Sequence, residues 1–216
     1  MNWKKYCQVI DMEEKWIFFD VGSTLVDETE AYNHRAKEMI ENTGITFSEF
    51  DAKRVELAKQ GLDGNSEAIK YFGLKKTPWH SEDEIPFEDA LDTLEKLKER
   101  GYKLGIIANQ SPGTAQRLEN WGLLTYFDVV AASGELGTAK PDRLIFEKAT
   151  QLAGCRFENA AMVGDRLDND IIPAKALGMK TVWIRKGLSR YQSVDLGKNV
   201  ADWVVDTLSE LKMVFR

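Results

Sequence analysis

Polar side chains capable of chemistry follow four short apolar runs of the sequence. The runs are WIFF, KLGIIA, FDVVAA and AAMVG. Runs of this length, rich in β-branched and aromatic residues, are typical of buried strands. The polar residues that come after them are Asp20, Asn109, Ser111, Lys140, Asp165 and Asp170.

Each of these residues also has an ordinary interpretation. An Asp after a strand is more often a turn residue or a helix cap, and a Lys-Pro pair such as Lys140–Pro141 is usually solvated loop. In a parallel sheet, however, ligands bind beyond the carboxyl ends of the strands, where all of these side chains would meet. Independent caps need not converge on one crevice, so the set favours a binding or catalytic site.

The residue types at this edge predict metal-assisted phosphoryl chemistry. Three carboxylates, those of Asp20, Asp165 and Asp170, repel one another unless cations intervene. Mg²⁺ prefers carboxylate and water ligands, and Lys140 supplies a further positive charge. Together they would hold a phosphoryl group against Asp20, whose attack would give an aspartyl-phosphate that water then hydrolyses.

The elements that must position these residues alternate along the chain. Amphipathic helical stretches such as EDALDTLEKLKERG and PDRLIFEKATQLAG separate the strand-like runs, and KTVWIR and ADWVV follow as the last two. Such alternation implies a parallel sheet with right-handed crossovers and helices on both faces. The sequence therefore predicts an α/β fold with a doubly wound, Rossmann-like parallel-sheet core.

A helical block interrupts this pattern after the first strand. TEAYNHRAKEMIENTG and FSEFDAKRVELAKQG each read as an amphipathic helix ending in Gly, and NSEAIKYFG as a shorter one. We expect a core of residues 15–27 and 80–216, an inserted helical unit of residues 28–79, and an N-terminal tail of residues 1–14. His80, near the return from the insertion, is interpreted as a surface residue without a positioned partner.

Composition narrows the function classes. The chain has 216 residues, 43% of them hydrophobic, and a net charge of −6 without a basic block, which argues against nucleic acid or an anionic membrane as partner. Only two cysteines occur, far apart, so a disulfide framework is not expected. No apolar run reaches the length of a membrane span, and no signal peptide is apparent. We expect a cytoplasmic protein.

Taken in order, the motifs resemble those of haloacid dehalogenase-type hydrolases. The matching segments are Asp20–Thr24, IIAN, GTAKPDRLIF and VGDRLDND, and the insertion looks like the C1 helical cap of that superfamily. The resemblance implies Asp20 as nucleophile and Lys140 as the phosphoryl-binding cation. It also implies a Mg²⁺ site and a small phosphorylated substrate. The implied metal ligands are Asp20, the Gly22 carbonyl, Asp165 and Asp170, and the implied substrate-binding residues are Thr24, Asn109, Ser111 and Lys140.

Two positions depart from the family's pattern. Phosphatases of this family carry a second Asp two residues after the nucleophile, as general acid and base, where this chain has Gly22. Their second motif usually ends its strand with Ser or Thr, where this chain has Ala108. Loss of proton transfer costs about 10²–10⁴-fold, and loss of a preorganised donor roughly 10²–10³-fold.

These departures leave alternatives open. A binding or regulatory protein would keep the metal and phosphate site but turn over poorly. A phosphonate hydrolase would place a small residue at Gly22 and form a Schiff base with a lysine of the insertion, for which Lys53 and Lys59 are the candidates. Dehalogenation needs no Mg²⁺ and fits the retained acid pair less well. A dinucleotide site lacks G-x-G-x-x-G.

Overall fold

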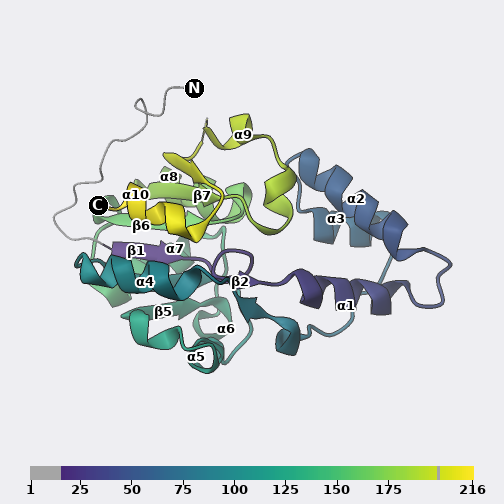
Figure 1. The fold of residues 1–216 in the computed structure, drawn as a ribbon, viewed down its shortest axis with the longest axis horizontal. Helices are drawn as coiled ribbons and strands as arrows, with labels where there is room; N and C mark the ends of the chain where they lie inside the picture. The colour runs from purple at the N-terminus through teal and green to yellow at the C-terminus, as the bar shows by residue number, and fades with distance from the viewer. Residues whose placement is uncertain (1–15, 199) are drawn as a thin grey trace.

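The computed structural model describes residues 16–198 and 200–216, so the predicted tail 1–14 lies outside the described residues. A six-stranded parallel sheet with the order β5-β4-β1-β6-β7-β8 forms its centre (Figure 1). The predicted α/β fold is confirmed. The strands are β1 (Trp16–Phe19), β4 (Lys103–Ala108), β5 (Val129–Ala132), β6 (Ala160–Gly164), β7 (Lys180–Ile184) and β8 (Trp203–Val205).

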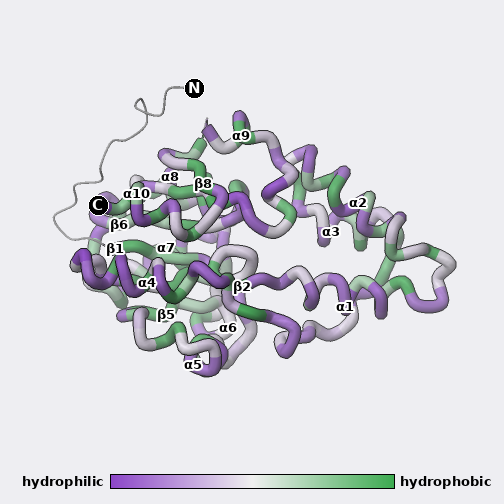
Figure 2. Tube along the Cα trace, in the orientation of Figure 1, coloured by the Kyte–Doolittle hydropathy of each residue, from purple (hydrophilic) through white to green (hydrophobic). Residues whose placement is uncertain are grey.

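Side-chain alternation along the central strand divides the core between the two faces of the sheet. Ile17 and Phe19 of β1 belong to one apolar cluster, and Trp16 and Phe18 to another. Figure 2 shows the apolar residues concentrated in and around the strands. Helices α4 (Ala90–Glu99), α5 (Thr114–Asn120) and α10 (Leu211–Val214) cover the first face, and α7 (Arg143–Ala153) and α8 (Ile172–Ala176) the second.

Helix α7 illustrates how local sequence sets these elements. The Asp142 carboxylate accepts a hydrogen bond from the Leu144 backbone N–H at 2.9 Å, and Gly154 ends the helix in the left-handed conformation. Between these caps Ile145 and Phe146 are fully buried against the sheet. Burying each such side chain contributes about 1.5–3 kcal/mol, so packing outweighs either cap.

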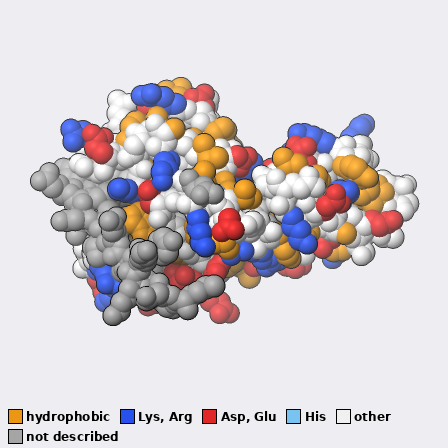
Figure 3. Space-filling model, turned by 90° about the horizontal axis from the view of Figure 1, so that it is seen from above, with side chains coloured by type: hydrophobic (Ala, Val, Ile, Leu, Met, Phe, Trp, Pro, Cys, Tyr) orange, Lys and Arg blue, Asp and Glu red, His pale blue; other side chains and the backbone are white. Residues whose placement is uncertain are grey.

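The insertion after the first strand consists of α1 (Thr29–Ile40), α2 (Phe47–Lys59) and α3 (Gly64–Tyr71). These helices pack on one another around a small apolar cluster of their own rather than into the clusters of the sheet. In Figure 3 they form a lobe joined to the larger body by a narrower waist. The buried members of this cluster are Ala36, Met39, Phe50, Ala68 and Ile69.

The two connections between sheet and insertion pair with each other. β2 (Val26–Asp27) and β3 (Ile85–Pro86) form a two-stranded antiparallel sheet that the sequence did not indicate. The expected irregular stretch before residue 87 therefore contains a strand. The remaining helical elements are η2 (Ser81–Asp83), η3 (Leu124–Tyr126), α6 (Ser133–Leu136), η4 (Phe157–Asn159), η5 (Leu167–Ile171), η6 (Gly187–Tyr191), α9 (Val194–Lys198) and η7 (Leu208–Glu210).

His80 differs from its interpretation as an unpartnered surface residue. Its side chain is 17% exposed and stacks on His34 of α1, with ring centroids 3.7 Å apart. Its Nε2 lies 3.0 Å from Glu38 and its Nδ1 3.1 Å from Glu82. These contacts join the returning connection to α1.

Among the described residues, none of the helices has the length and apolarity that crossing a bilayer requires.

Candidate active site

Lys140 forms the centre of a buried charge cluster at the carboxyl ends of the strands. Its Nζ lies 2.7 Å from Oδ1 of Asp20 and 2.6 Å from Oδ1 of Asp170. Lys140 is 4% exposed and Asp170 1%. Charges so deeply buried are tolerated only when paired. The structure therefore brings together three residues that are separated by up to 150 positions in the sequence, as the strand order requires.

Asp165 and Asp170 are fixed by backbone contacts beyond β6. Trp183 Nε1 donates to the Asp165 carbonyl oxygen at 2.7 Å, and the Arg166 N–H donates to Oδ2 of Asp170 at 2.9 Å. Gly164 makes the turn possible, because a Cβ there would lie 2.4 Å from the Asp170 carboxylate. The end of VGDRLDND therefore folds back so that both carboxylates face Lys140 and Asp20.

Negative charge exceeds positive charge in this cluster. Burial, with repulsion by Asp170, Asp20 and Glu28, raises the pKa of Asp165 well above its usual range. Burial alone would lower the pKa of Lys140, but attraction by Asp170 and Asp20 outweighs it and raises that pKa. Asp20, Asp165 and Asp170 each offer an oxygen within 4.8 Å of the others. An excess of converging carboxylates around one lysine fits a divalent cation.

The loop after β1 places Asp20 at this edge. The Asp20 N–H donates to the Val163 carbonyl at 2.9 Å, which extends the pairing of β1 with β6 by one residue. Ser23 then adopts a left-handed φ of 53°, which tightens the turn. Thr24 is fully buried, and its hydroxyl has no hydrogen-bond partner among the described residues.

Glu28, which follows this loop, was missed in the sequence. It is 8% exposed, and its Oε2 accepts a hydrogen bond from Ser23 Oγ at 3.2 Å. Burial first, and then repulsion by Asp20 and Glu84, raises the pKa of Glu28 to about 8. Glu28 stands directly before α1, where an acid reads as an ordinary helix N-terminal residue. No local signal distinguished it.

Of the two polar residues predicted after β4, Asn109 contacts the charge cluster and Ser111 does not. Asn109 Nδ2 donates to the Lys140 carbonyl at 2.8 Å, and Asn109 Oδ1 accepts from the Lys140 N–H at 2.7 Å. The amide of Asn109 therefore holds the backbone of the cluster's lysine. Ser111 is exposed, and its carbonyl accepts hydrogen bonds from Thr114 and Arg117. Ala108 is fully buried at the end of β4.

A cavity of about 280 Å³ lies between the insertion and the sheet edge. From the sheet side it is lined by Ser23, Asp165 and Arg166, and from the insertion by Tyr32, Arg54 and Asp63. Arg166 Nη1 pairs with Asp63 Oδ2 at 2.8 Å across it. Arg54 is held by the side chains of Asp51, Asn33 and Asn65. The cavity walls therefore carry charged and polar groups beside apolar ones, and they reach from the charge cluster into the insertion.

An α/β sheet with a lysine–carboxylate cluster at its carboxyl edge and a helical insertion after the first strand defines a class of hydrolases. The family model described as haloacid dehalogenase-like hydrolase matches residues 17–184. The chain belongs to this family.

The similarity to known proteins covers nearly the whole chain. A glyceraldehyde 3-phosphate phosphatase of Pyrococcus furiosus is 34% identical, with 91% of each chain covered. A pyrophosphatase PpaX of Bacillus mycoides is 27% identical and covers 93% of this chain and 96% of its own. Among solved structures, a HAD phosphatase from Thermococcus onnurineus is 28% identical with a TM-score of 0.64, covering 92% of this chain and 96% of that one.

Proposed function

We propose that this protein is a magnesium-dependent phosphatase that hydrolyses a small phosphorylated substrate through an aspartyl-phosphate on Asp20. The observation that carries the proposal is the position of Lys140, within 2.7 Å of Asp20 and 2.6 Å of Asp170, beside Asp165. A lysine in that position would bind a phosphoryl oxygen while the carboxylate of Asp20 attacks phosphorus. The phosphatase names of the relatives support the same reaction class.

The carboxylate cluster fits a magnesium site. Asp20, the Gly22 carbonyl and Asp165 would hold the ion directly. Both oxygens of Asp170 already have partners, Lys140 and the Arg166 N–H, so Asp170 would contribute through water. A bound Mg²⁺ would neutralise these carboxylates and polarise the phosphoryl oxygens.

The other residues of the site would position these groups. Asn109 would hold the backbone of Lys140, since both ends of its amide bond to that residue. Substrate contacts from Thr24 and Ser111 stay predictions. The buried hydroxyl of Thr24, without a partner among the described residues, favours the first of them.

We further propose that residues 28–79 act as a cap over a core of residues 15–27 and 80–216. Its support is the separate apolar cluster of the insertion and the cavity that it forms with the sheet edge. Substrate selection would then depend on Tyr32, Arg54 and Asp63, while the nucleophile and the phosphoryl-binding lysine come from the core.

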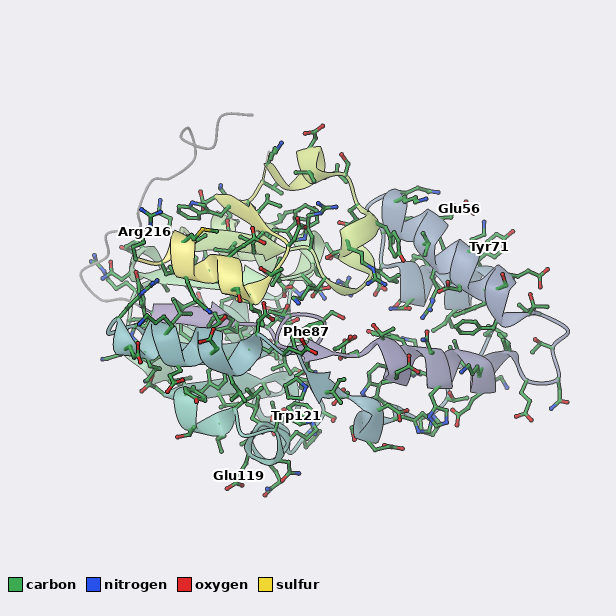
Figure 4. The ribbon with its side chains drawn as sticks, viewed as in Figure 1. Glu56, Tyr71, Phe87, Glu119, Trp121 and Arg216 are labelled. Atoms are coloured by element: carbon green, nitrogen blue, oxygen red, sulfur yellow. The ribbon has the colours of Figure 1, made fainter. Side chains whose placement is uncertain are left out.

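The phosphonate alternative has less support. A Schiff-base lysine needs a lowered pKa in the substrate cavity. The hydrogen bond from Lys53 to Glu56, 2.6 Å long, raises the pKa of Lys53 instead, and its Nζ lies over the Tyr71 ring. Figure 4 shows Glu56 and Tyr71 on the insertion, away from the sheet. Neither Lys53 nor Lys59 lines the cavity.

The direct test is phosphate release from a panel of phosphorylated metabolites and aryl phosphates, with and without Mg²⁺. We expect Mg²⁺-dependent turnover that Asp20→Asn abolishes. Glu158→Gln is the control, because Glu158 is exposed, does not line the cavity and, among the described residues, pairs only with the exposed Arg156. Turnover that survives Asp20→Asn would contradict the proposal.

A further inference from the structure

Glu28 occupies the space beside Gly22 in which a side chain at position 22 would lie. A Cβ built on Gly22 would be 2.3 Å from Oε1 and 2.6 Å from Oε2 of Glu28. Gly22 is not among the residues with positive φ, so its backbone does not demand glycine. A Cβ at this position would displace the Glu28 carboxylate, which is the far end of a flexible side chain, because contacts so short do not occur.

Three of the neighbouring carboxylates, those of Asp170, Asp27 and Glu84, have other partners. Asp170 is shared between Lys140 and the Arg166 N–H. Asp27 accepts the Thr29 N–H at 2.9 Å at the start of α1, and Glu84 accepts Trp79 Nε1 at 2.7 Å. Glu28, in contrast, is held by the hydroxyl of Ser23 and touches the nucleophile's own loop at Gly22.

We propose that Glu28 is the proton-transferring residue of the reaction, its carboxylate replacing a side chain at position 22. A general acid or base must reach the reacting oxygens on the side of the nucleophile's loop, and the buried Glu28 carboxylate lies there. This inference rests on the proposed phosphatase function. Glu28 comes from the connection between β2 and α1, not from a strand end of the large sheet.

The reaction would have two steps, and they balance because Glu28 gives up one proton in the first and takes one proton back in the second. In the first, an Asp20 oxygen bonds to phosphorus, the bond from phosphorus to the leaving oxygen breaks, and that oxygen takes the proton from the Glu28 carboxyl. In the second, water bonds to phosphorus and gives a proton to the Glu28 carboxylate. The bond between Asp20 and phosphorus then breaks, which releases phosphate and restores both side chains.

The leaving group of the substrate distinguishes proton transfer by Glu28 from a purely structural role of this residue. An alkoxide departs poorly without a proton, whereas p-nitrophenolate departs unprotonated. We expect Glu28→Gln to lower kcat/KM on an alkyl phosphate such as glycerol phosphate by about 10²–10⁴-fold, and on p-nitrophenyl phosphate by roughly 10-fold or less. Glu84→Gln, another buried carboxylate of the same connection region, should lower both rates equally if at all.

An equal loss on both substrates, or no loss on either, would overturn the inference while leaving the phosphatase proposal intact. So would a Mg²⁺ affinity as weak in Glu28→Gln as in Asp165→Asn, because Glu28 would then be a metal ligand. A wild type inactive on both substrates, or an active Asp20→Asn, would instead contradict the proposed function itself.

A double variant keeps the test decisive if Glu28→Gln is unstable. Gly22→Asp alone should displace the Glu28 side chain, because its Cβ meets the Glu28 carboxylate. Gly22→Asp with Glu28→Ala frees that space and returns a carboxylate from the other side. We expect it to recover at least 10-fold of the alkyl phosphate turnover lost in Glu28→Ala. A folded double variant as slow as Glu28→Ala would contradict the inference.

Discussion

The sheet and the helical insertion are stabilised in different ways. All four residues of β1 and all five of β6 are buried, and the sheet has an apolar cluster on each face. The insertion has one cluster of five buried residues, and on its side of the cavity Arg54 is held by the side chains of Asn33 and Asp51. The sheet edge therefore holds Lys140 within 3 Å of both Asp20 and Asp170, whereas the helices of the insertion supply the opposite wall of the cavity.

The comparison implies that a buried charge at the sheet edge contributes far more to the free energy of unfolding than a surface charge does. Lys140→Met leaves the buried carboxylate of Asp170 and the partly buried one of Asp20 without their counter-charge, and we expect a loss of about 3–5 kcal/mol in unfolding free energy, together with activity. The matched control is Lys175→Met, which removes an exposed pair with Asp202 and should cost at most about 1 kcal/mol. Urea denaturation of both variants measures this, and equal losses would contradict it.

The second prediction concerns the metal. Asp165→Asn removes a carboxylate that burial and like charges disfavour, so the metal-free variant should be at least as stable as the wild type. Its Mg²⁺ affinity should nevertheless fall by roughly 10²-fold. Calorimetric titration of both proteins, with Asp168→Asn as control, tests this. Equal affinities in wild type and Asp165→Asn would remove Asp165 from the metal site.

The third prediction concerns the contact between the two regions. Burial opposes ionisation of Asp63, but Arg166 and the hydrogen bonds from Ser66 together outweigh it and hold the pKa of Asp63 below its usual value. The stability that these contacts contribute is therefore present above the pKa of Asp63 in the unfolded chain. It is lost as the pH falls through the lower pKa of Asp63 in the folded protein. We expect Asp63→Asn to cost about 1–2 kcal/mol and to speed hydrogen exchange in α3. Glu67→Gln, which loses only an exposed pair with Lys70, should leave that exchange unchanged.

The smallest effect is expected at His80. Hydrogen bonding to Glu38, and then to Glu82, raises the pKa of His80 above 6.5, with His34 stacked on its ring. The stability this contributes is complete below pH 6.5 and lost as the pH rises through the folded pKa. His80→Gln should flatten the pH dependence of unfolding free energy across that window. An unchanged slope would show that the contacts of His80 contribute nothing.

Local patterns were sufficient to predict the sheet. Each strand is a short apolar run, and the carboxyl ends of parallel strands must share one edge, so the meeting of Asp20, Lys140 and Asp170 followed from order alone. The ends of α7 were equally predictable from the sequence, because Asp142 and Gly154 are residue types that favour the start and the end of a helix.

Contacts across the insertion were not predictable in this way. The pairing of β2 with β3 joins two residues at each end of a long helical block, and its register depends on how that block folds. The burial of Glu28 depends on the same geometry. In the sequence Gly22 reads as a missing carboxylate, whereas the structure places the carboxylate of Glu28 in the vacated space.

The central claim is that phosphoryl transfer proceeds through Asp20. Rapid acid quench during turnover of p-nitrophenyl phosphate with Mg²⁺, followed by mass spectrometry of the peptide that contains residues 16–28, measures it directly. We expect that peptide to carry one phosphoryl group on Asp20, at higher occupancy in Glu28→Gln, where water attack is slowed. Turnover without any phosphorylated Asp20 in either protein would contradict the account.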